Sequence, residues 1–427
     1  MKNKFKLALQ RSRPISISLS PNVEKDDVLL ALNLLIRPWK WKKGKEIKIL
    51  ENEFANYLGV KYAVSFNSGR SALFAILKAL ELPEKSNIFF QAFTCNASIN
   101  PALWLKLNPI YVDCNQENFN IDIDDLKKNI QNNPEAKILI IQHTFGTPAN
   151  MKEILKVAEE NNLILIEDCA HALGAQYYGK MLGTFGKAGF FSFSRDKVIS
   201  CVYGGMAVTN DPSLAKKLLQ LQGKFRQPGT FWILQQLLHP ILLYFIILPI
   251  YIFFNLGKLF LIFTQILHIL SKAVSYEEKQ GKMPNYFPKA LPNALAISAL
   301  NQFSKLDKFY IHRKKLFDYY LENLKNTDFV LPEVSREYKP SYLRFTIRHP
   351  DAHKIIYNAW HGENILLGDW YTTVIAPFDT NLDKMHYKEG SCLNAEILAE
   401  TTLNLPTHIN IKIEDAERIV NFLKQWK

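Results

Sequence analysis

Apolar residues follow two alternating patterns through the first half of the chain. Short apolar runs that are typical of buried strands occur at residues 62–66, 110–112, 138–141 and 163–167. Between them lie segments with helical spacing of the apolar positions, among them the amphipathic segment 151–161. Strands that alternate with helices in this way predict a mostly parallel sheet in an α/β domain.

The pattern changes after about residue 294, where a long helical segment is followed by strands and by a helix over 413–426. This change predicts a smaller C-terminal α+β domain. We therefore expect a basic N-terminal arm (1–25), a large domain (26–228 and 276–300), a hydrophobic helical insert (229–275) and a small C-terminal domain (301–427).

The insert contains a stretch, residues 231–270, that is far more apolar than the rest of the chain. Lys258 is its one formal charge in 40 residues. Pro240 and Pro249 are expected to break the first helical run, and residues 255–258 to turn the chain. The second run, 259–270, would be a helix about 18 Å long, shorter than a hydrocarbon core of about 30 Å.

Two interpretations of this stretch remain open. The segments on either side of it belong to one folded unit, so both ends must lie on the same side of any membrane. A shallow hairpin in one leaflet fits this requirement, and the flanking Lys and Arg residues suit an anionic cytoplasmic surface. The alternative is a pair of helices buried at a dimer interface.

Composition and charge narrow the class of protein. The chain has 427 residues, of which 48% are hydrophobic and 22% charged, which excludes a disordered chain. Lys and Arg outnumber Asp and Glu by 52 to 40, so the net charge is +12 and an anionic partner is expected. We see no nucleic-acid recognition motif and predict no nucleic-acid partner. Five scattered Cys without a CxxC pair favour a reducing cytosol.

Two candidate segments precede the middle of the chain. Residues 67–73 (NSGRSAL) form a small-residue turn between a predicted strand and a helix, where exposed N–H groups can bind an anion. The alternative is an ordinary strand-to-helix turn. Asp168 ends a buried parallel strand, at the edge where ligands bind in open α/β sheets. Its alternative role is to cap the helix that follows.

Two further segments follow in the order that one chemistry requires. Residues 190–197 (FFSFSRDK) deliver two hydroxyls and then Lys197, which taken alone is a solvated lysine. A glycine pair, Gly204 and Gly205, comes next and allows close approach of the backbone to a flat ligand. Together, an amine that forms a Schiff base, an acid for a pyridine nitrogen and a phosphate-binding turn indicate pyridoxal 5'-phosphate (PLP) chemistry.

The chain resembles the DegT–StrS family of PLP-dependent sugar aminotransferases, from about residue 25 to the C-terminus. The resemblance implies a fold-type-I transferase. The segments that carry it are GKEIKILENEFANYLGVKY (44–62), the SGRSAL turn, YVD (111–113), HTFGTP (143–148), EDCAHALGA (167–175), GTFG (183–186), FSFSRDK, GGMAVTN and LPTH (405–408).

The resemblance assigns roles to individual residues. Lys197 matches the Schiff-base lysine that also moves the proton, and Asp168 matches the acid that keeps the pyridine nitrogen protonated. Ser192 matches the phosphate-binding hydroxyl, and the backbone N–H groups of Gly69 and Arg70 match those that hold the phosphate. The Arg70 guanidinium, where the family has Thr or Ser, either adds to phosphate binding or points away.

Three further positions depart from the family pattern. His171 stands where the family usually has Gln, near the phenolic oxygen of the cofactor, and could donate a hydrogen bond or titrate. Cys95 replaces the aromatic residue that usually stacks on the cofactor ring, a role for which Phe93 is the substitute. The segment that reaches the partner subunit's cofactor is poorly kept, with Asn285 as its nearest candidate.

The resemblance implies an aminotransferase that moves an amino group, with glutamate as the donor, to a nucleotide-linked or lipid-linked keto-sugar in cell-surface glycan biosynthesis. We expect a cytoplasmic homodimer attached to the inner face of the cell membrane through 231–270. Two alternatives remain: a PLP-dependent sugar dehydratase, which Lys197 disfavours, and a non-catalytic membrane scaffold of the same fold.

Overall fold

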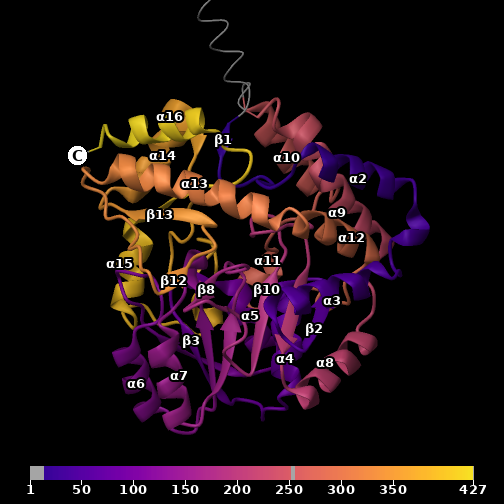
Figure 1. Cartoon of the computed structure of the whole chain (residues 1–427), viewed down its shortest axis with the longest axis vertical. Helices are drawn as coiled ribbons and strands as arrows, with labels where there is room; N and C mark the ends of the chain where they lie inside the picture. The colour runs from indigo at the N-terminus through magenta and orange to yellow at the C-terminus, as the bar shows by residue number, and fades with distance from the viewer. Residues whose placement is uncertain (1–13, 252–254, 427) are drawn as a thin grey trace, which may run out of the picture.

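The computed structural model describes residues 14–251 and 255–426. Its main feature is a seven-stranded sheet with the order β2-β11-β10-β7-β6-β3-β5, in the lower half of Figure 1. Five strands run parallel to one another: β10, β7, β6, β3 and β5. Strand β11 runs antiparallel to both of its neighbours, β2 and β10. This confirms the predicted α/β fold with a mostly parallel sheet. The strands are β2 (Tyr62–Phe66), β3 (Asn87–Gln91), β5 (Asn108–Val112), β6 (Ile138–Gln142), β7 (Ile164–Asp168), β10 (Ala188–Ser192) and β11 (Gly205–Thr209).

Helices cover both faces of this sheet, because alternate strand residues bury apolar side chains on each face. In β6, Leu139 and Ile141 belong to one apolar core, and Ile138 and Ile140 belong to the other. The first core includes residues of α3 (Glu46–Leu58), α6 (Ile123–Asn132), α7 (Met151–Glu160) and α12 (Asn293–Phe303). The second includes residues of α4 (Gly69–Ala79), α5 (Asn96–Trp104), α8 (Pro212–Lys224) and α15 (Leu393–Thr401).

A third core forms the upper left part of Figure 1. It contains the antiparallel pair of β13 (Arg344–Arg348) and β16 (Thr402–Pro406), covered by α13 (Leu306–Leu324), α14 (Ala352–Glu363) and α16 (Ile413–Leu423). The N-terminal strand β1 (Ile15–Ser16) pairs with β14 (Ile365–Leu366) of this region. Residues between 371 and 399 instead pack into the core beside α4 and α5, so the C-terminal segment contributes to both parts.

Short strands complete the structure. β8 (Gln176–Tyr177) pairs with β9 (Lys180–Met181) and with β12 (Tyr338–Lys339). β15 (Ile375–Ala376) pairs in parallel with β4 (Thr94–Cys95), which brings a late segment of the chain beside an early one. That pairing lies next to the carboxyl edge of the large sheet.

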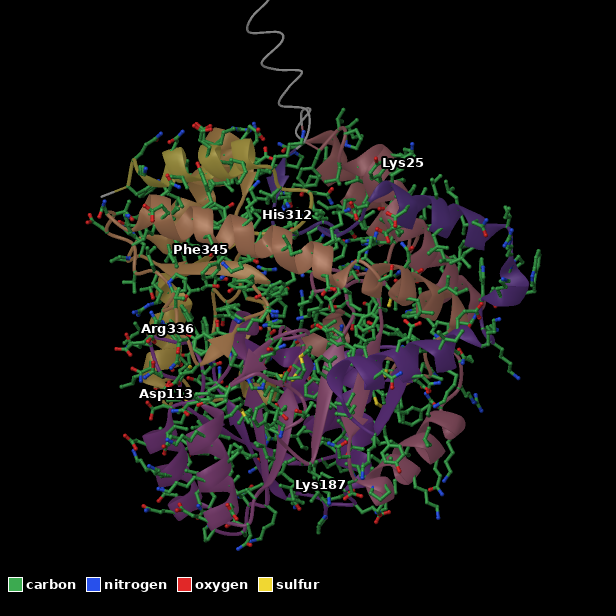
Figure 2. The ribbon with its side chains drawn as sticks, viewed as in Figure 1. Lys25, Asp113, Lys187, His312, Arg336 and Phe345 are labelled. Atoms are coloured by element: carbon green, nitrogen blue, oxygen red, sulfur yellow. The ribbon has the colours of Figure 1, made fainter. Side chains whose placement is uncertain are left out.

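The carboxyl edge of the sheet faces the C-terminal region. Lys187, just before β10, lies at the bottom of Figure 2, whereas Phe345 of β13 lies in the upper part. β10 therefore runs upward and ends at Ser192, next to Asp168 at the end of β7. The chain leaves β2 on the same side and enters α4 at Gly69, whose N-cap, Ser68, accepts a hydrogen bond from Ser71 N at 3.0 Å.

The apolar insert folds as two helical runs on the outside of this unit. α9 (Thr230–Leu242) continues into a π-helical turn, η3 (Leu243–Ile247), and α10 (Leu256–Ile266) follows. Pro240 lies inside α9, so the expected break at this proline is wrong, and the helix changes pitch in η3 instead. Gly257 allows α10 to cross the end of η3, because a Cβ there would lie 2.4 Å from Ile247 O.

The inner side of the insert packs against the rest of the protein. Ile233 and Leu237 of α9 share an apolar core with Leu34 of α2 (Lys25–Leu35) and with Trp41. By length and apolar composition, the run Thr230–Ile247 would suffice to cross a membrane, but 44% of it is buried inside the protein. This helical run is therefore in large part a packed helix of the folded unit.

We predict that Gly205→Ala is destabilising, because β11 meets the N-terminus of α4 at this glycine. A Cβ at residue 205 would lie 2.3 Å from Ser68 C and 2.4 Å from Gly69 N, which are backbone atoms. We expect the free energy of unfolding to fall by about 1–3 kcal/mol in urea denaturation. Gly223→Ala, in α8 with no heavy atom within 4 Å of the added Cβ, is the control. We expect it to be neutral or to stabilise by up to about 1 kcal/mol. An equal effect of the two substitutions would contradict this account.

Candidate active site

A cavity of about 260 Å³ lies at the carboxyl edge of the sheet. It collects residues from both ends of the chain, because the loop after β14 closes over the strand ends. Six of the predicted site residues line it: Gly69, Arg70, Asp168, His171, Ser192 and Lys197. The other lining residues include Cys95, Ser98, Arg195, Asp196, Tyr203, Ala273, Asp369, Trp370 and Phe378.

Asp168 is held in one orientation by two hydrogen bonds. Its Oδ1 accepts from Ala170 N at 2.9 Å, and its Oδ2 accepts from the Ser98 hydroxyl at 2.9 Å. Burial raises the pKa of this carboxyl, and the two hydrogen bonds and the nearby Lys197 oppose the rise. The Asp168 side chain is thus an oriented acid in a dry site, as pairing with a protonated pyridine nitrogen requires.

Lys197 carries the amine of the site. Its Nζ lies 4.6 Å from the centre of the Trp370 ring, in the position of a cation–π contact. Burial lowers the pKa of this amine to about 8, against the opposing effect of Cys95 and Asp168. The amine therefore loses its proton far more readily than an exposed lysine, which is what a nucleophile or general base needs near neutral pH.

His171 is a neutral ring with a defined tautomer. Phe145 N–H donates to its Nδ1 at 3.3 Å, which leaves the ring proton on Nε2. Burial, with Lys197 and Arg344 nearby, lowers the pKa of His171 well below its ordinary value. Of the two roles left open by the sequence, the structure favours that of a hydrogen-bond donor over that of a titrating group. The ring also stacks on Trp370, at 5.0 Å between ring centres.

The N-terminus of α4 forms the other end of the cavity. Gly69 approaches Ser192 so closely that a Cβ would lie 3.0 Å from the Ser192 Cβ and 3.4 Å from its hydroxyl oxygen. The free N–H groups of this helix and the Ser192 hydroxyl therefore face the same space. The Arg70 guanidinium turns aside, forming a buried ion pair with Glu278 and donating to Ala273 O at 3.0 Å.

Two predicted site residues lie outside the cavity lining. Phe93 is fully buried and contacts Phe145 and Tyr371 edge to face, so its position does not support a role in stacking on the cofactor. Cys95 lines the cavity at the position that the family fills with an aromatic ring. Asn285 is exposed on the outside of this chain, as a residue that reaches a second subunit would be.

The sequence alone did not reveal several residues of the site. Trp370 and Asp369 come from a loop without a recognisable motif, and β15 next to them pairs with β4. The Arg344 guanidinium lies 3.4 Å from the centre of the Trp370 ring. No local pattern pointed to Glu278, because the burial of Arg70 that its carboxylate compensates follows from the tertiary structure.

These residues fit PLP. The phosphate end has free helix N–H groups, a hydroxyl and a close approach of Gly69 to Ser192. In the same cavity, Asp168 would bind the pyridine nitrogen, Lys197 would react with the aldehyde carbon, and the His171 Nε2–H would donate to an oxygen acceptor. When bound, PLP supplies a pyridine ring that accepts the electron pair of the substrate carbon.

The fold and the site together define the class of protein, a PLP-dependent transferase of fold type I. Within that class, the chain belongs to the DegT/DnrJ/EryC1/StrS aminotransferase family, whose sequence pattern matches residues 23–232 and 275–424. This confirms the predicted family and its cofactor, PLP. The unmatched residues, 233–274, coincide closely with the predicted insert.

Characterised relatives in sequence include two sugar enzymes. GDP-perosamine synthase of Escherichia coli O157:H7 is 37% identical over 186 residues, which are 44% of this chain and 50% of that enzyme. UDP-N-acetyl-3-dehydro-alpha-D-glucosamine 3-aminotransferase of Acidithiobacillus ferrooxidans is 27% identical over 404 residues, or 94% of each chain. The chain thus aligns with about half of the first enzyme and with nearly all of the second.

Solved structures share the fold. Helicobacter pylori PseC, an aminotransferase of pseudoaminic acid biosynthesis, has a TM-score of 0.72 and is 21% identical, with 97% of this chain and 99% of that chain covered. A Streptococcus pneumoniae protein solved in its PLP form has a TM-score of 0.75 at 19% identity, covering 96% of this chain and 98% of that one.

We predict that Lys197 reacts with PLP as a base whose pKa is about 8. Below that pH the fraction of free amine rises about tenfold per pH unit. In protein stripped of cofactor, the initial rate of appearance of the visible absorbance after PLP addition should therefore rise with pH and level off above about pH 8. Lys197→Ala protein gives the background from exposed lysines. A rate that continues to rise toward 10.5, the ordinary pKa of lysine, would contradict the effect of burial.

Proposed function

We propose that this protein is a PLP-dependent aminotransferase that moves an amino group from glutamate to a keto group of a sugar. The observation that carries the proposal is the meeting of Lys197 and Asp168 in one buried cavity whose other end is the N-terminus of α4. This arrangement separates a base, an acid and an anion site, as the chemistry of both half-reactions requires.

Each residue of the site has a separate role in the proposed reaction. Lys197 removes the proton from the carbon that bears the amino group of the donor, and delivers a proton to the second reacting carbon. The lowered pKa of its amine suits both proton transfers. Asp168, fixed by Ser98, favours the protonated pyridine nitrogen and so the electron-accepting ring. His171 donates from Nε2 and holds the ring orientation, and the burial of Asp168 and His171 limits their contact with bulk water.

The sugar is most simply a nucleotide-linked one. The names of two relatives state GDP-linked and UDP-linked sugars, which supports a nucleotide diphosphate handle on the substrate. The cavity opens beside Phe378, which is 80% exposed and suited to stack on a flat or sugar ring. A lipid-linked keto-sugar presents the same diphosphate and is the second substrate class to be tested.

We predict that Lys197→Ala lowers the rate of amino transfer by at least about a hundredfold, because the proton then has no carrier. The assay supplies glutamate and a panel of nucleotide-linked and lipid-linked keto-sugars, and mass spectrometry follows exchange of oxygen for an amine. Lys187→Ala is the matched control, since Lys187 is half-exposed and paired with Asp211 at the opposite end of β10.

Other outcomes of the same assay point to other functions. Loss of water from the sugar, without gain of nitrogen, would identify a dehydratase. Absence of both cofactor binding and amino transfer in the wild-type protein would favour a scaffold. Full activity in Lys197→Ala would overturn the assignment of this lysine.

We further propose that two copies of the chain form the working enzyme in the cytoplasm. The exposed Asn285 and the exposed Phe378 at the cavity mouth support a second subunit near each site. The sequence pattern of the family stops at residue 232 and resumes at residue 275, so the insert lies outside the matched part of the chain. The surface of the matched part remains available for contact with a second subunit.

We also propose that the outer face of the insert contacts the inner leaflet of the cell membrane. The side chains of Leu259, Ile262, Phe263 and Ile266 in α10, and of Leu267 directly after it, are 44–65% exposed and follow the spacing of one helix face. The apolar stripe of this helix thus points outward, the reverse of a helix that covers a core. The exposed residues Lys258 and Lys272 suit anionic lipid headgroups beside it. Because α10 has 11 residues, about 16 Å, it would lie in the interface rather than cross it.

We predict that the double variant Phe263→Ser with Ile266→Ser binds vesicles of phosphatidylglycerol and phosphatidylcholine at least about tenfold more weakly than the wild type, because two apolar side chains no longer enter the lipid. Flotation with the vesicles measures this. Ile311→Ser, on α13 and 69% exposed, is the control. Equal flotation of all three proteins would refute the membrane contact. Conversion of a dimer to a monomer by the double variant, seen in light scattering, would assign this face to a second copy.

A further inference from the structure

Arg195 brings a buried positive charge to the cavity without an acidic partner. Its side chain is only 9% exposed, and its Nη2 donates to both the carbonyl and the hydroxyl oxygen of Ser271 at 2.6 Å. Its Nε is buried without a hydrogen-bond partner among the described residues. Among the described residues the guanidinium forms no ion pair, and the nearby carboxylate of Asp196 acts on it only through the electrostatic field. A buried guanidinium held in this way has unused hydrogen-bonding capacity.

The position of Arg195 places this capacity at the anion end of the cavity. Arg195 follows Ser192 by three residues and lines the same cavity as Gly69, the first residue of α4. The ring of Tyr203 lies between two guanidinium groups, with Arg195 Cζ 5.6 Å and Arg70 Cζ 5.9 Å from its centre. Arg195 thus contacts the same Tyr203 ring as Arg70, a residue of the first turn of α4.

The balance of charge at this end requires an anion. Glu278 neutralises Arg70 by a buried ion pair. Arg195 has no such partner, and the N-terminus of α4 adds a partial positive charge. A buried cation without an ion-pair partner is costly, so this end of the cavity suits a negative ligand that accepts hydrogen bonds from a guanidinium and from helix N–H groups. A phosphate group meets both requirements.

We propose that Arg195 is a phosphate-binding residue of this site, acting on the phosphate of the cofactor or on a phosphate of the substrate. The inference rests on the proposed function in taking PLP and a nucleotide-linked sugar as ligands. It adds a residue that neither the family resemblance nor the motif assigned.

The support for Arg195 comes from the apolar insert. Ser271 lies in 233–274, the segment that the family pattern does not match. Its hydroxyl donates to Gln236 Oε1 of α9 at 2.8 Å while accepting from Arg195. Both ends of the insert therefore fix the guanidinium, and the insert forms part of the phosphate end of the active site as well as an outer apolar face.

The test compares PLP with pyridoxal, which has the same ring and aldehyde but no phosphate. Dissociation constants of both are measured by absorbance for the wild type, Arg195→Gln, Arg195→Lys and the control Arg226→Gln, whose side chain is exposed on the same domain. We expect Arg195→Gln to weaken PLP at least about tenfold, the worth of a charge-assisted hydrogen bond, with pyridoxal unchanged. Arg195→Lys should recover part of the loss. Ser271→Ala, which keeps the arginine and removes one of its two acceptors, should lose about two- to fivefold.

A second arm identifies the source of the phosphate. If Arg195→Gln leaves the ratio of PLP to pyridoxal affinity unchanged but weakens binding of UDP and GDP to the cofactor-loaded protein tenfold, the residue binds the substrate phosphate. If Arg195→Gln binds PLP and the two nucleotides as tightly as Arg226→Gln does, the inference is overturned. The proposed function survives that outcome as long as the wild-type protein binds PLP and transfers the amine. A wild type that binds no PLP would instead refute the proposed function.

Discussion

Charged groups buried together at the end of one sheet are the constraint on which this structure depends. Most of them have a group of opposite charge nearby, because burial of an unpaired charge is costly. Asp168 and Lys197 oppose each other across the cavity, and Glu278 compensates Arg70. The segments that supply these groups are far apart in the sequence, so the fold brings them together before any ligand arrives. This arrangement results from the order of the strands, from the antiparallel direction of β11, and from the segment after α10, which leads the chain back to the sheet.

Much of the fold could be read from the sequence because its signals are local. Residues 62–66 and 138–141 were predicted as strands and lie in β2 and β6. The predicted helix 151–161 matches α7, which ends one residue earlier. The same holds for the motif residues Asp168 and Lys197, since a strand end and its following turn fix the position of a side chain. Periodicity and turn chemistry are properties of neighbouring residues and need no knowledge of the tertiary structure.

The rest depends on contacts between distant segments. The direction of the Arg70 side chain is decided by Glu278, 208 residues later, and Phe93 is drawn into the core by Tyr371. Trp370 reaches the site only because β15 pairs with β4. Likewise, the apolar insert gave a composition signal but not its inner contacts, and Pro240 is tolerated inside α9 because that helix is packed against α2 and α12. Such outcomes follow from packing energies that no local pattern contains.

The pairing of β1 with β14 has a consequence for the order in which the protein is made. A chain that emerges from its N-terminus must hold residues 15–16 without a partner until residues 365–366 have been synthesised. The cavity wall at 369–378 is later still, whereas the apolar segment 231–270 emerges well before either. Its hydrophobic side chains therefore leave the ribosome before the C-terminal segments that complete the cores of the domain. If the proposed membrane contact forms, a lipid surface would shield that segment during synthesis and would place the enzyme beside the membrane from the outset.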